Sequence, residues 1–419
     1  MNRDKGFTDR FLGVAVKVQN NLYLKAISDG FAALMPLIMV GAIFAVIDSL
    51  GIPVYQDFLV NIGIKDFLKF PNMVTNGLLS IYVAFSIAYN LAKNYKLDEF
   101  MSGFVSIMAF MLLQPFTAAA DGSYQIGMNL LGAEGIFTAI IAAIVVVECT
   151  RFLINHNIYV KMPKEVPEMV ERSFKALTTV VLVMAVILLV KIAFAATSLG
   201  TLSNLIAIVI QAPLKSLGSS WISFAIILTI VNLLWFFGIH GHLVALSVML
   251  PVYLQMDIEN LAAYQAGTTL PNILSNSFIY VYGSGACVLA GFVYCLWRAK
   301  TERFKTIAKL AFVPMLFGIG EPLAFGVPFV FNFTLFIPAV FSGTINVILA
   351  YFATVVGILP RLNGVSINGL PVVVSGFLTG GFRVALFQVV LCILNIAVWS
   401  IFVKKMDQVE FEKEQLQAE

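Results

Sequence analysis

The sequence is organised around residues 310–340, which read LAFVPMLFGIGEPLAFGVPFVFNFTLFIPAV. Glu321 is the one charged side chain between positions 310 and 360, and four prolines interrupt the apolar run of residues 310–340. A carboxylate surrounded by apolar sequence is costly in a lipid-facing helix, so it is expected to face a cavity or a partner. Broken helices at membrane depth are tolerated only where they line such a cavity. This stretch therefore predicts a polar substrate site inside a membrane.

The composition indicates a membrane protein rather than a soluble one. The 419-residue chain is 60% hydrophobic and 12% charged, whereas soluble domains carry about 25% charged residues. We expect an all-α polytopic membrane protein with about ten transmembrane helices, plus re-entrant hairpins and interfacial helices. The expected spans are residues 29–50, 74–92, 100–120, 132–154, 176–197, 220–239, 243–256, 278–297, 329–355 and 384–403.

The basic residues predict the orientation of these spans. Twenty lysines and arginines fall on one set of connecting segments and five on the other. Because cytoplasmic loops carry the excess of basic residues, this bias predicts a multi-pass protein of the cytoplasmic membrane with both termini inside. The net charge of +3 gives no indication of nucleic-acid binding. The first 25 residues lack the basic start and short apolar core of a cleaved signal peptide.

The polar segment 155–175 separates four expected spans from six. We therefore expect an N-terminal membrane subdomain at 1–160, a cytoplasmic linker at 161–175, a C-terminal subdomain at 176–405 and a cytoplasmic tail at 406–419. An ordinary cytoplasmic loop explains the polar segment equally well.

Four further segments do not look like straight spans. Residues 310–328 are too broken and are expected to form a re-entrant hairpin. An interfacial helix is expected at 198–219. Residues 257–277 predict an outer loop or a second re-entrant element. Five glycines in residues 361–383 predict an irregular segment.

A second unusual run lies between residues 216 and 256, which contain no Asp, Glu, Lys or Arg. Its two histidines, His240 and His242, lie in the sequence GIHGH. Glycines beside a histidine break a helix and let a ligand approach the backbone. The alternative is a histidine that forms hydrogen bonds between membrane helices. Together with Glu321, His240 is our candidate for substrate binding.

Other polar and aromatic residues of the second half suit a sugar, which needs hydrogen-bonding groups and aromatic faces. The candidates are Trp235, Asn272, Asn276, Tyr280, Ser284 and Asn332. Each of them alone is also explained by packing or helix capping. The four cysteines form no CxxC pair, and no glycine-rich nucleotide loop or acidic metal cluster is present in the sequence. We therefore expect no disulfide, no metal and no bound cofactor.

Three motifs, GIHG (238–241), GIGEPLAFGVP (318–328) and MPKEVPEMVERSFKAL (162–177), resemble the membrane component, EIIC, of bacterial sugar phosphotransferase systems. The resemblance is to the lactose/cellobiose/diacetylchitobiose group and runs from about Phe7 to Lys405. It implies a homodimer with a dimerisation half and a substrate-binding half that moves like an elevator. It also implies that a separate cytoplasmic EIIB, supplied by EIIA, phosphorylates the sugar's 6-hydroxyl from a phosphocysteine.

The resemblance implies that His240 and Glu321 bind this 6-hydroxyl as the catalytic pair, and either of them can be the general base. The expected substrate-binding residues are Trp235, His240, Gly241, Asn276, Ser284, Gly320, Glu321, Pro322 and Asn332. The expected substrate is a β-linked disaccharide similar to cellobiose, with diacetylchitobiose or lactose as alternatives. The residues alone also allow a proton-coupled sugar symporter with Glu321 as the proton carrier.

Overall fold

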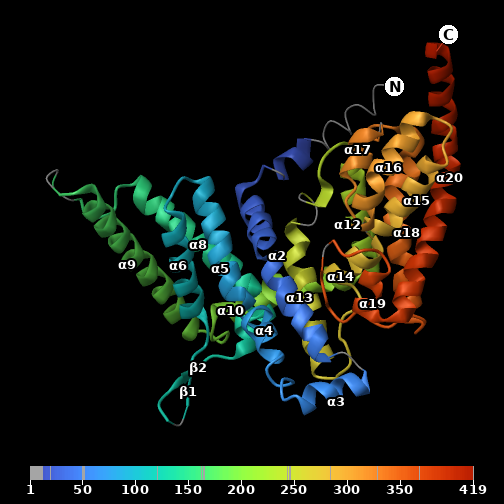
Figure 1. Ribbon diagram of the computed structural model, residues 1–419. Coiled ribbons are helices and arrows are strands. Elements are labelled where there is room, and N and C mark those ends of the chain that lie inside the picture. Colours follow the sequence, from blue (N-terminus) through green and yellow to red (C-terminus); the bar gives the residue numbers. More distant parts are fainter. Residues whose placement is uncertain are drawn as a thin grey trace. The chain divides into compact units, whose positions relative to one another are not determined.

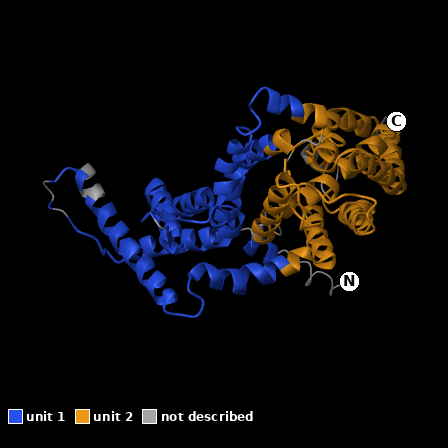
Figure 2. Cartoon of the chain, turned by 90° about the horizontal axis from the view of Figure 1, so that it is seen from below, with its two compact units in different colours: residues 1–44, 57–215 blue, residues 45–56, 216–419 orange. Residues whose placement is uncertain are grey.

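The computed structural model describes residues 13–18, 20–49, 52–119, 121–161, 163, 166–242, 244, 247–283, 285–327, 329–367 and 369–418. The chain divides into two compact units, which Figure 2 shows in different colours. Unit 1 consists of residues 1–44 and 57–215, and unit 2 of residues 45–56 and 216–419. The boundary expected from the sequence, 161–175, differs from this division. The helix that follows the polar segment packs on helices of unit 1 and therefore belongs to that unit.

The elements are labelled in Figure 1. The first part of the chain contains α2 (Leu22–Ser49), α3 (Pro53–Asn61), α4 (Lys69–Val74), η1 (Asn76–Leu78), α5 (Leu79–Asn94), α6 (Glu99–Leu113), β1 (Thr117–Ala118), β2 (Tyr124–Gln125), α7 (Met128–Leu131), η2 (Ala133–Gly135), α8 (Ile136–Asn155), α9 (Glu168–Ala195), α10 (Leu202–Ile206), η3 (Ala207–Gln211) and α11 (Ala212–Ser219). The second part contains α12 (Trp221–Phe236), α13 (Ser247–Gln265), α14 (Asn276–Phe278), η5 (Ile279–Gly283), α15 (Ala286–Trp297), α16 (Glu302–Leu316), α17 (Glu321–Gly326), η6 (Phe333–Leu335), α18 (Phe336–Val355), α19 (Val374–Gly380) and α20 (Phe382–Ala418).

Seven helical stretches of the described chain are long and apolar enough to cross a membrane. An eighth results if residues 202–219 and 221–236, which are bent by 84° against each other, are counted as one broken span. The all-α polytopic prediction is confirmed. The number of spans found by length and composition is below the expected ten, because α6 is shorter and α13 is not apolar enough.

Two expected boundaries are wrong. The helix expected at 100–120 ends at Leu113, because Pro115 follows and disfavours helical geometry at the residue before it. Beyond the proline, β1 and β2 pair as a short antiparallel hairpin with Thr117 opposite Gln125. Of the span expected at 243–256, residues 247–256 belong to α13, which continues to Gln265. The residues after Lys405 continue α20 as one helix to residue 418.

Unit 1 packs α5, α6 and α8 against one another through small residues, as is common in membrane helix bundles. A methyl group at Gly103 would lie 2.5 Å from the Phe85 ring, so the two helices are closely packed there. Lys191 of α9 donates from Nζ to the carbonyl oxygens of Leu112 and Gln114, at 2.7 and 3.1 Å. This lysine therefore satisfies carbonyls at the end of α6, which explains a charge within an apolar helix.

Unit 2 is built on α15, α16, α18 and α20. α15 and α20 pack so closely that a methyl group at Gly291 would lie 2.6 Å from the backbone of Asn395. The Asn395 side chain also donates to Oδ1 of Asn346 in α18 at 3.0 Å. α16 and α17 form a helical hairpin, because the Arg303 guanidinium donates to the carbonyl of Gly326 at 3.1 Å. The stretch 310–328 therefore folds back as a hairpin; its depth in the bilayer stays a prediction.

Candidate functional site

The helices that precede the two sequence motifs, α12 and α16, end in the same way. Two residues after the last residue of each helix comes a glycine followed by an isoleucine, with φ of +78° at Gly238 and +77° at Gly318. Each glycine N–H donates to the carbonyl three residues earlier, at 3.0 and 2.9 Å, and each isoleucine N–H to the carbonyl five residues earlier, at 2.9 and 3.1 Å. This is the Schellman C-cap, which needs a left-handed residue and therefore favours glycine. Both motifs are thus rigid helix ends.

The structure brings the two motif regions together in unit 2. The N–H of Phe331, five residues beyond the hairpin, donates to the carbonyl of Phe236 at the end of α12, at 3.1 Å. A methyl group at Gly238 would meet the Val330 side chain at 3.2 Å. The Phe237 and Phe331 rings are 5.4 Å apart. α17, which begins at Glu321 and ends just before this contact, is only about 9 Å long. The backbones that carry the two motifs therefore converge.

His240 lies in an aromatic environment, half-buried beside Trp235 and His242. Its ring centroid is 4.5 Å from that of Trp235 and 6.1 Å from that of His242. The Trp235 indole N–H donates to Nδ1 of His242 at 3.2 Å. Because an indole can only donate, His242 accepts on Nδ1 and carries its ring proton on Nε2. The structure thus groups Trp235, His240 and His242 in one cluster of rings; sugar binding by His240 stays a prediction.

Gly241 has a packing role that explains why the motif needs glycine after the histidine. A methyl group at this position would lie 2.0 Å from the carbonyl oxygen of Val231 in α12. Real side-chain carbons do not come so close to backbone atoms, so only glycine lets the chain fold back onto the helix here. This contact fixes the backbone that carries His240.

Glu321 is the first residue of α17, and Gly320 precedes it as the N-cap. Pro322 stands in the first turn, where its fixed φ and missing N–H suit a helix start. A methyl group at Gly320 would meet only the Leu289 side chain, at 3.4 Å. The backbone of Glu321 is described and its side chain is not, so its distance to His240 stays a prediction. Ser284 also lies outside the described residues.

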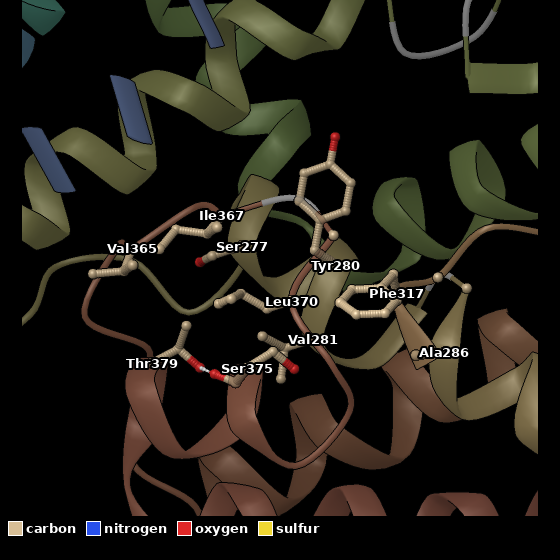
Figure 3. A pocket seen from close by; sticks show the side chains of 13 residues that line it. Ser277, Tyr280, Val281, Ala286, Phe317, Val365, Ile367, Leu370, Ser375 and Thr379 are labelled. Atoms are coloured by element: carbon tan, nitrogen blue, oxygen red, sulfur yellow. Dashed lines mark hydrogen bonds between the residues drawn. The ribbon is translucent and has the colours of Figure 1, made fainter. Parts of the chain in front are cut away.

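A pocket opens beside the hairpin, shown in Figure 3, and encloses about 480 Å³ including space open to solvent. The lining residues are Ser277, Tyr280, Val281, Gly285, Ala286, Phe317, Gly318, Val365, Ile367, Gly369, Leu370, Ser375 and Thr379. The Tyr280 hydroxyl points away from Ser375 and Thr379, so hydroxyl groups lie at opposite sides of the view. His240 is not among the residues described as lining this pocket.

Two helix breaks meet in the pocket wall. Gly285 has φ of +54°, and a methyl group there would lie 3.0 Å from Cα and O of Gly318. The break before α15 thus rests directly on the break between α16 and α17. Before the first of these breaks the helix contains a π-helical turn, η5. Such turns in a longer helix are frequent at functional sites.

A buried carboxylate holds the start of the first broken helix. Asp257 of α13 is 2% exposed and accepts from the N–H and the hydroxyl of Ser277, at 2.8 and 2.7 Å. Asn276 beside it donates to the Ser366 hydroxyl at 2.6 Å. These bonds tie α13, α14 and the segment after Arg361 into one wall of the pocket. They also explain why α13 continues through an acidic residue, since the acid is buried and satisfied rather than in lipid.

Gln388 of α20 connects the other pocket elements. Its Oε1 accepts from the N–H groups of Val373 and Gly376, at 2.8 and 3.0 Å, at the start of α19. Its Nε2 donates to the carbonyl of Val281 and the hydroxyl of Ser375, at 2.9 and 3.0 Å. One buried amide therefore satisfies the broken backbone on two sides of the pocket.

We expect Gln388→Leu to destabilise unit 2 strongly, because each buried polar group left unpaired costs about 1–3 kcal/mol. The thermal unfolding midpoint in detergent should fall, and sugar binding should weaken. Gln408→Leu, an exposed glutamine on the same helix, is the matched control. An unchanged midpoint for Gln388→Leu would show that these bonds do not hold the pocket.

Some predicted residues have structural partners. Asn332 caps η6 by accepting from the N–H of Thr334 at 3.1 Å, and its amide reaches Sδ of Met406 at 3.5 Å. The Asn272 amide donates to the Glu259 carboxylate at 2.9 Å. Sugar binding by Asn332 and Asn276 therefore stays a prediction. Of the candidates, Tyr280 lines the pocket.

The sequence reasoning missed Phe317, Ser375 and Thr379 as pocket residues. Ser375 and Thr379 lie in the glycine-rich segment that predicted irregular structure. The hydroxyl side chains in that irregular, apolar segment could have indicated the pocket, because irregular backbone at membrane depth is found where it lines a cavity.

A family model described as "Phosphotransferase system, EIIC" matches residues 28–343. This chain belongs to the EIIC family of the phosphotransferase system. This EIIC protein is 32% identical to the cellobiose-specific EIIC component of Geobacillus stearothermophilus, over 97% of this chain and 95% of that protein. It is 30% identical to the oligo-beta-mannoside-specific EIIC component of Bacillus subtilis, over 97% of this chain and 94% of that protein.

The solved structures give the same assignment. The EIIC protein is similar to the crystal structure of the transporter ChbC, the IIC component from the N,N'-diacetylchitobiose-specific phosphotransferase system. The TM-score is 0.91 at 31% identity, covering 96% of this chain and 98% of that chain. The resemblance found in the three sequence motifs is therefore confirmed, and the chain is a multi-pass membrane component of a phosphotransferase complex.

Proposed function

We propose that this EIIC protein carries a β-linked disaccharide across the membrane and presents its 6-hydroxyl to the phosphocysteine of a separate EIIB protein. The observation that carries the proposal is the hydrogen bond from the N–H of Phe331 to the carbonyl of Phe236. It joins the segment that follows Glu321 to the segment that precedes His240. A pocket with hydroxyl groups and two aromatic rings, Tyr280 and Phe317, lies beside the same hairpin. Sugars are bound by this combination of groups.

The chemistry follows from what the two side chains can do. A carboxylate accepts a hydrogen bond, and an imidazole donates or accepts one, so together they can hold one hydroxyl. The hydroxyl oxygen attacks phosphorus, the phosphorus–sulfur bond to EIIB breaks, and the hydroxyl proton passes to Glu321 or His240. A positioned base of this kind accelerates the transfer. The product is the sugar 6-phosphate, and the thiolate stays on EIIB.

The substrate class is supported by the relatives, whose names refer to cellobiose, oligo-β-mannosides and diacetylchitobiose. A cellobiose-like disaccharide is our first candidate, with diacetylchitobiose and lactose as alternatives. The proposal includes a homodimer formed by the N-terminal part, an elevator-like movement of the C-terminal part, cytoplasmic termini and EIIA upstream of EIIB.

The proposal is tested in right-side-out membrane vesicles or proteoliposomes that enclose the phosphoryl donor proteins on the cytoplasmic side. Labelled cellobiose should cross only as its 6-phosphate, and only when EIIB is phosphorylated. Uptake of unmodified sugar that follows a proton gradient and ignores the donors would support a symporter instead.

His240→Ala should weaken binding of a disaccharide about tenfold, the loss of about 1.4 kcal/mol expected for a hydrogen bond between polar groups. Binding of the analogue that lacks the 6-hydroxyl should hardly change. His156→Ala is the matched control, because His156 is an exposed residue of unit 1. An equal loss for both ligands would remove His240 from contact with the 6-hydroxyl.

A further inference from the structure

The C-terminal part of α20 contacts the residues just before α16. Asp407 is 7% exposed, and its carboxylate accepts from the backbone N–H groups of Lys300 and Thr301, at 2.7 and 3.0 Å. These residues immediately precede α16, where backbone donors have no partner within the helix. A buried carboxylate bonded to such donors is strongly favoured, because the hydrogen bonds are charge-assisted and the helix start is positive.

The same end of α20 also packs on the hairpin through apolar side chains. Trp399 stacks on Phe292 of α15, with ring centroids 4.3 Å apart. Val403 and Met406 belong to one buried cluster that includes residues of α16 and of α17. The members from the hairpin are Phe304, Ala308, Ala311, Met315, Leu323 and Val327. The part of α20 from Trp399 to Met406 therefore belongs to the core on which the hairpin rests.

The position of the α16–α17 hairpin determines the position of Glu321. Its open end is closed by the bond from Arg303 to the carbonyl of Gly326, and its turn is fixed by the C-cap at Gly318. Between them α16 is a continuous helix of 15 residues. A shift at the start of α16 therefore moves the turn and the first residue of α17 with it, because packed helices move as rigid bodies.

We propose that Asp407 is a positioning residue for Glu321: the end of α20 fixes the hairpin so that the carboxylate meets the 6-hydroxyl of the sugar. The inference rests on the proposed function of Glu321. According to this inference, the residues after Lys405, which follow the last apolar stretch, help to position the site and do not form a free tail. Asp407 touches no substrate and acts through α16.

The test is Asp407→Asn, which keeps the volume but leaves one oxygen to accept from two N–H groups. The rate of sugar phosphorylation should fall at least about tenfold, since a misplacement of about 1 Å can cost about 10²-fold. Affinity for the sugar should fall, whereas affinity for the analogue without the 6-hydroxyl should be kept. Glu410→Gln is the matched control, because this acid lies on the same helix and pairs with Lys413.

The ratio of the affinity for the sugar to the affinity for the analogue without the 6-hydroxyl distinguishes a positioning role of Asp407 from a general effect on stability. A loss of equal size for both ligands, or no change for either, would overturn the role of Asp407. Asp407→Ser, whose shorter side chain withdraws both accepting oxygens from the two N–H groups, is the more severe second variant and should shift the ratio further in the same direction. If the unmodified protein itself binds both ligands equally, the proposed contact of Glu321 with the 6-hydroxyl fails, and the two failures are thereby distinguished.

Discussion

Glu321→Gln is expected to abolish sugar phosphorylation while leaving sugar binding largely intact. The amide keeps the shape and a hydrogen-bonding oxygen, but it cannot take up the hydroxyl proton. The loss of a positioned base typically costs about 10²–10⁴-fold in rate. Phosphorylation is measured as 6-phosphate formation with phosphorylated EIIB, and binding by calorimetry in detergent.

Glu302→Gln controls for the removal of a negative charge from the same hairpin. Glu302 is exposed and pairs with Lys305, so both readouts should stay unchanged. If Glu321→Gln lowers binding and phosphorylation in parallel, Glu321 only holds the sugar. His240 is then the remaining candidate for the base.

Gly241→Ala is expected to unfold the loop that carries His240. The new methyl group would lie 2.0 Å from the Val231 carbonyl oxygen, and backbone stands on both sides of the contact, so no side-chain rotation relieves it. Overpacking of this kind typically costs about 1–3 kcal/mol, and more where the backbone cannot move. The thermal midpoint should fall and sugar binding should be lost.

Gly320→Ala is the control for folding stability. Its methyl group meets only the Leu289 side chain, at 3.4 Å, so the midpoint should hardly move. Equal midpoints for the two variants would show that the close approach at Gly241 does not hold the loop.

Much of the fold follows from simple features of the sequence. Long apolar runs predicted the spans, because a membrane helix must hide its backbone and expose apolar side chains. The hairpin around Glu321 was predicted from prolines and glycines that break an apolar run.

Two of the failures have the same physical cause, which is that buried polar residues find partners far along the chain. Asp257 looked like the end of a span, yet Ser277 satisfies it inside the protein. Asp407 looked like part of a solvated tail, yet it caps a helix more than 100 residues earlier. Hydropathy alone cannot distinguish a solvated carboxylate from one that accepts backbone hydrogen bonds.

The candidate site was predicted in its parts and not in its assembly. The glycines of GIHG and GIGEP indicated breaks, and the structure shows that Gly238 and Gly318 are matching C-caps. Spacing in the sequence gave no indication that Phe331 donates back to the end of α12, because the two residues lie far apart in the sequence.

The most direct test of the central claim is a structure of the EIIC protein with a bound disaccharide. The 6-hydroxyl oxygen should lie within hydrogen-bonding distance, about 2.6–3.2 Å, of both the His240 ring and the Glu321 carboxylate. A sugar bound with its 6-hydroxyl away from either side chain would contradict the account.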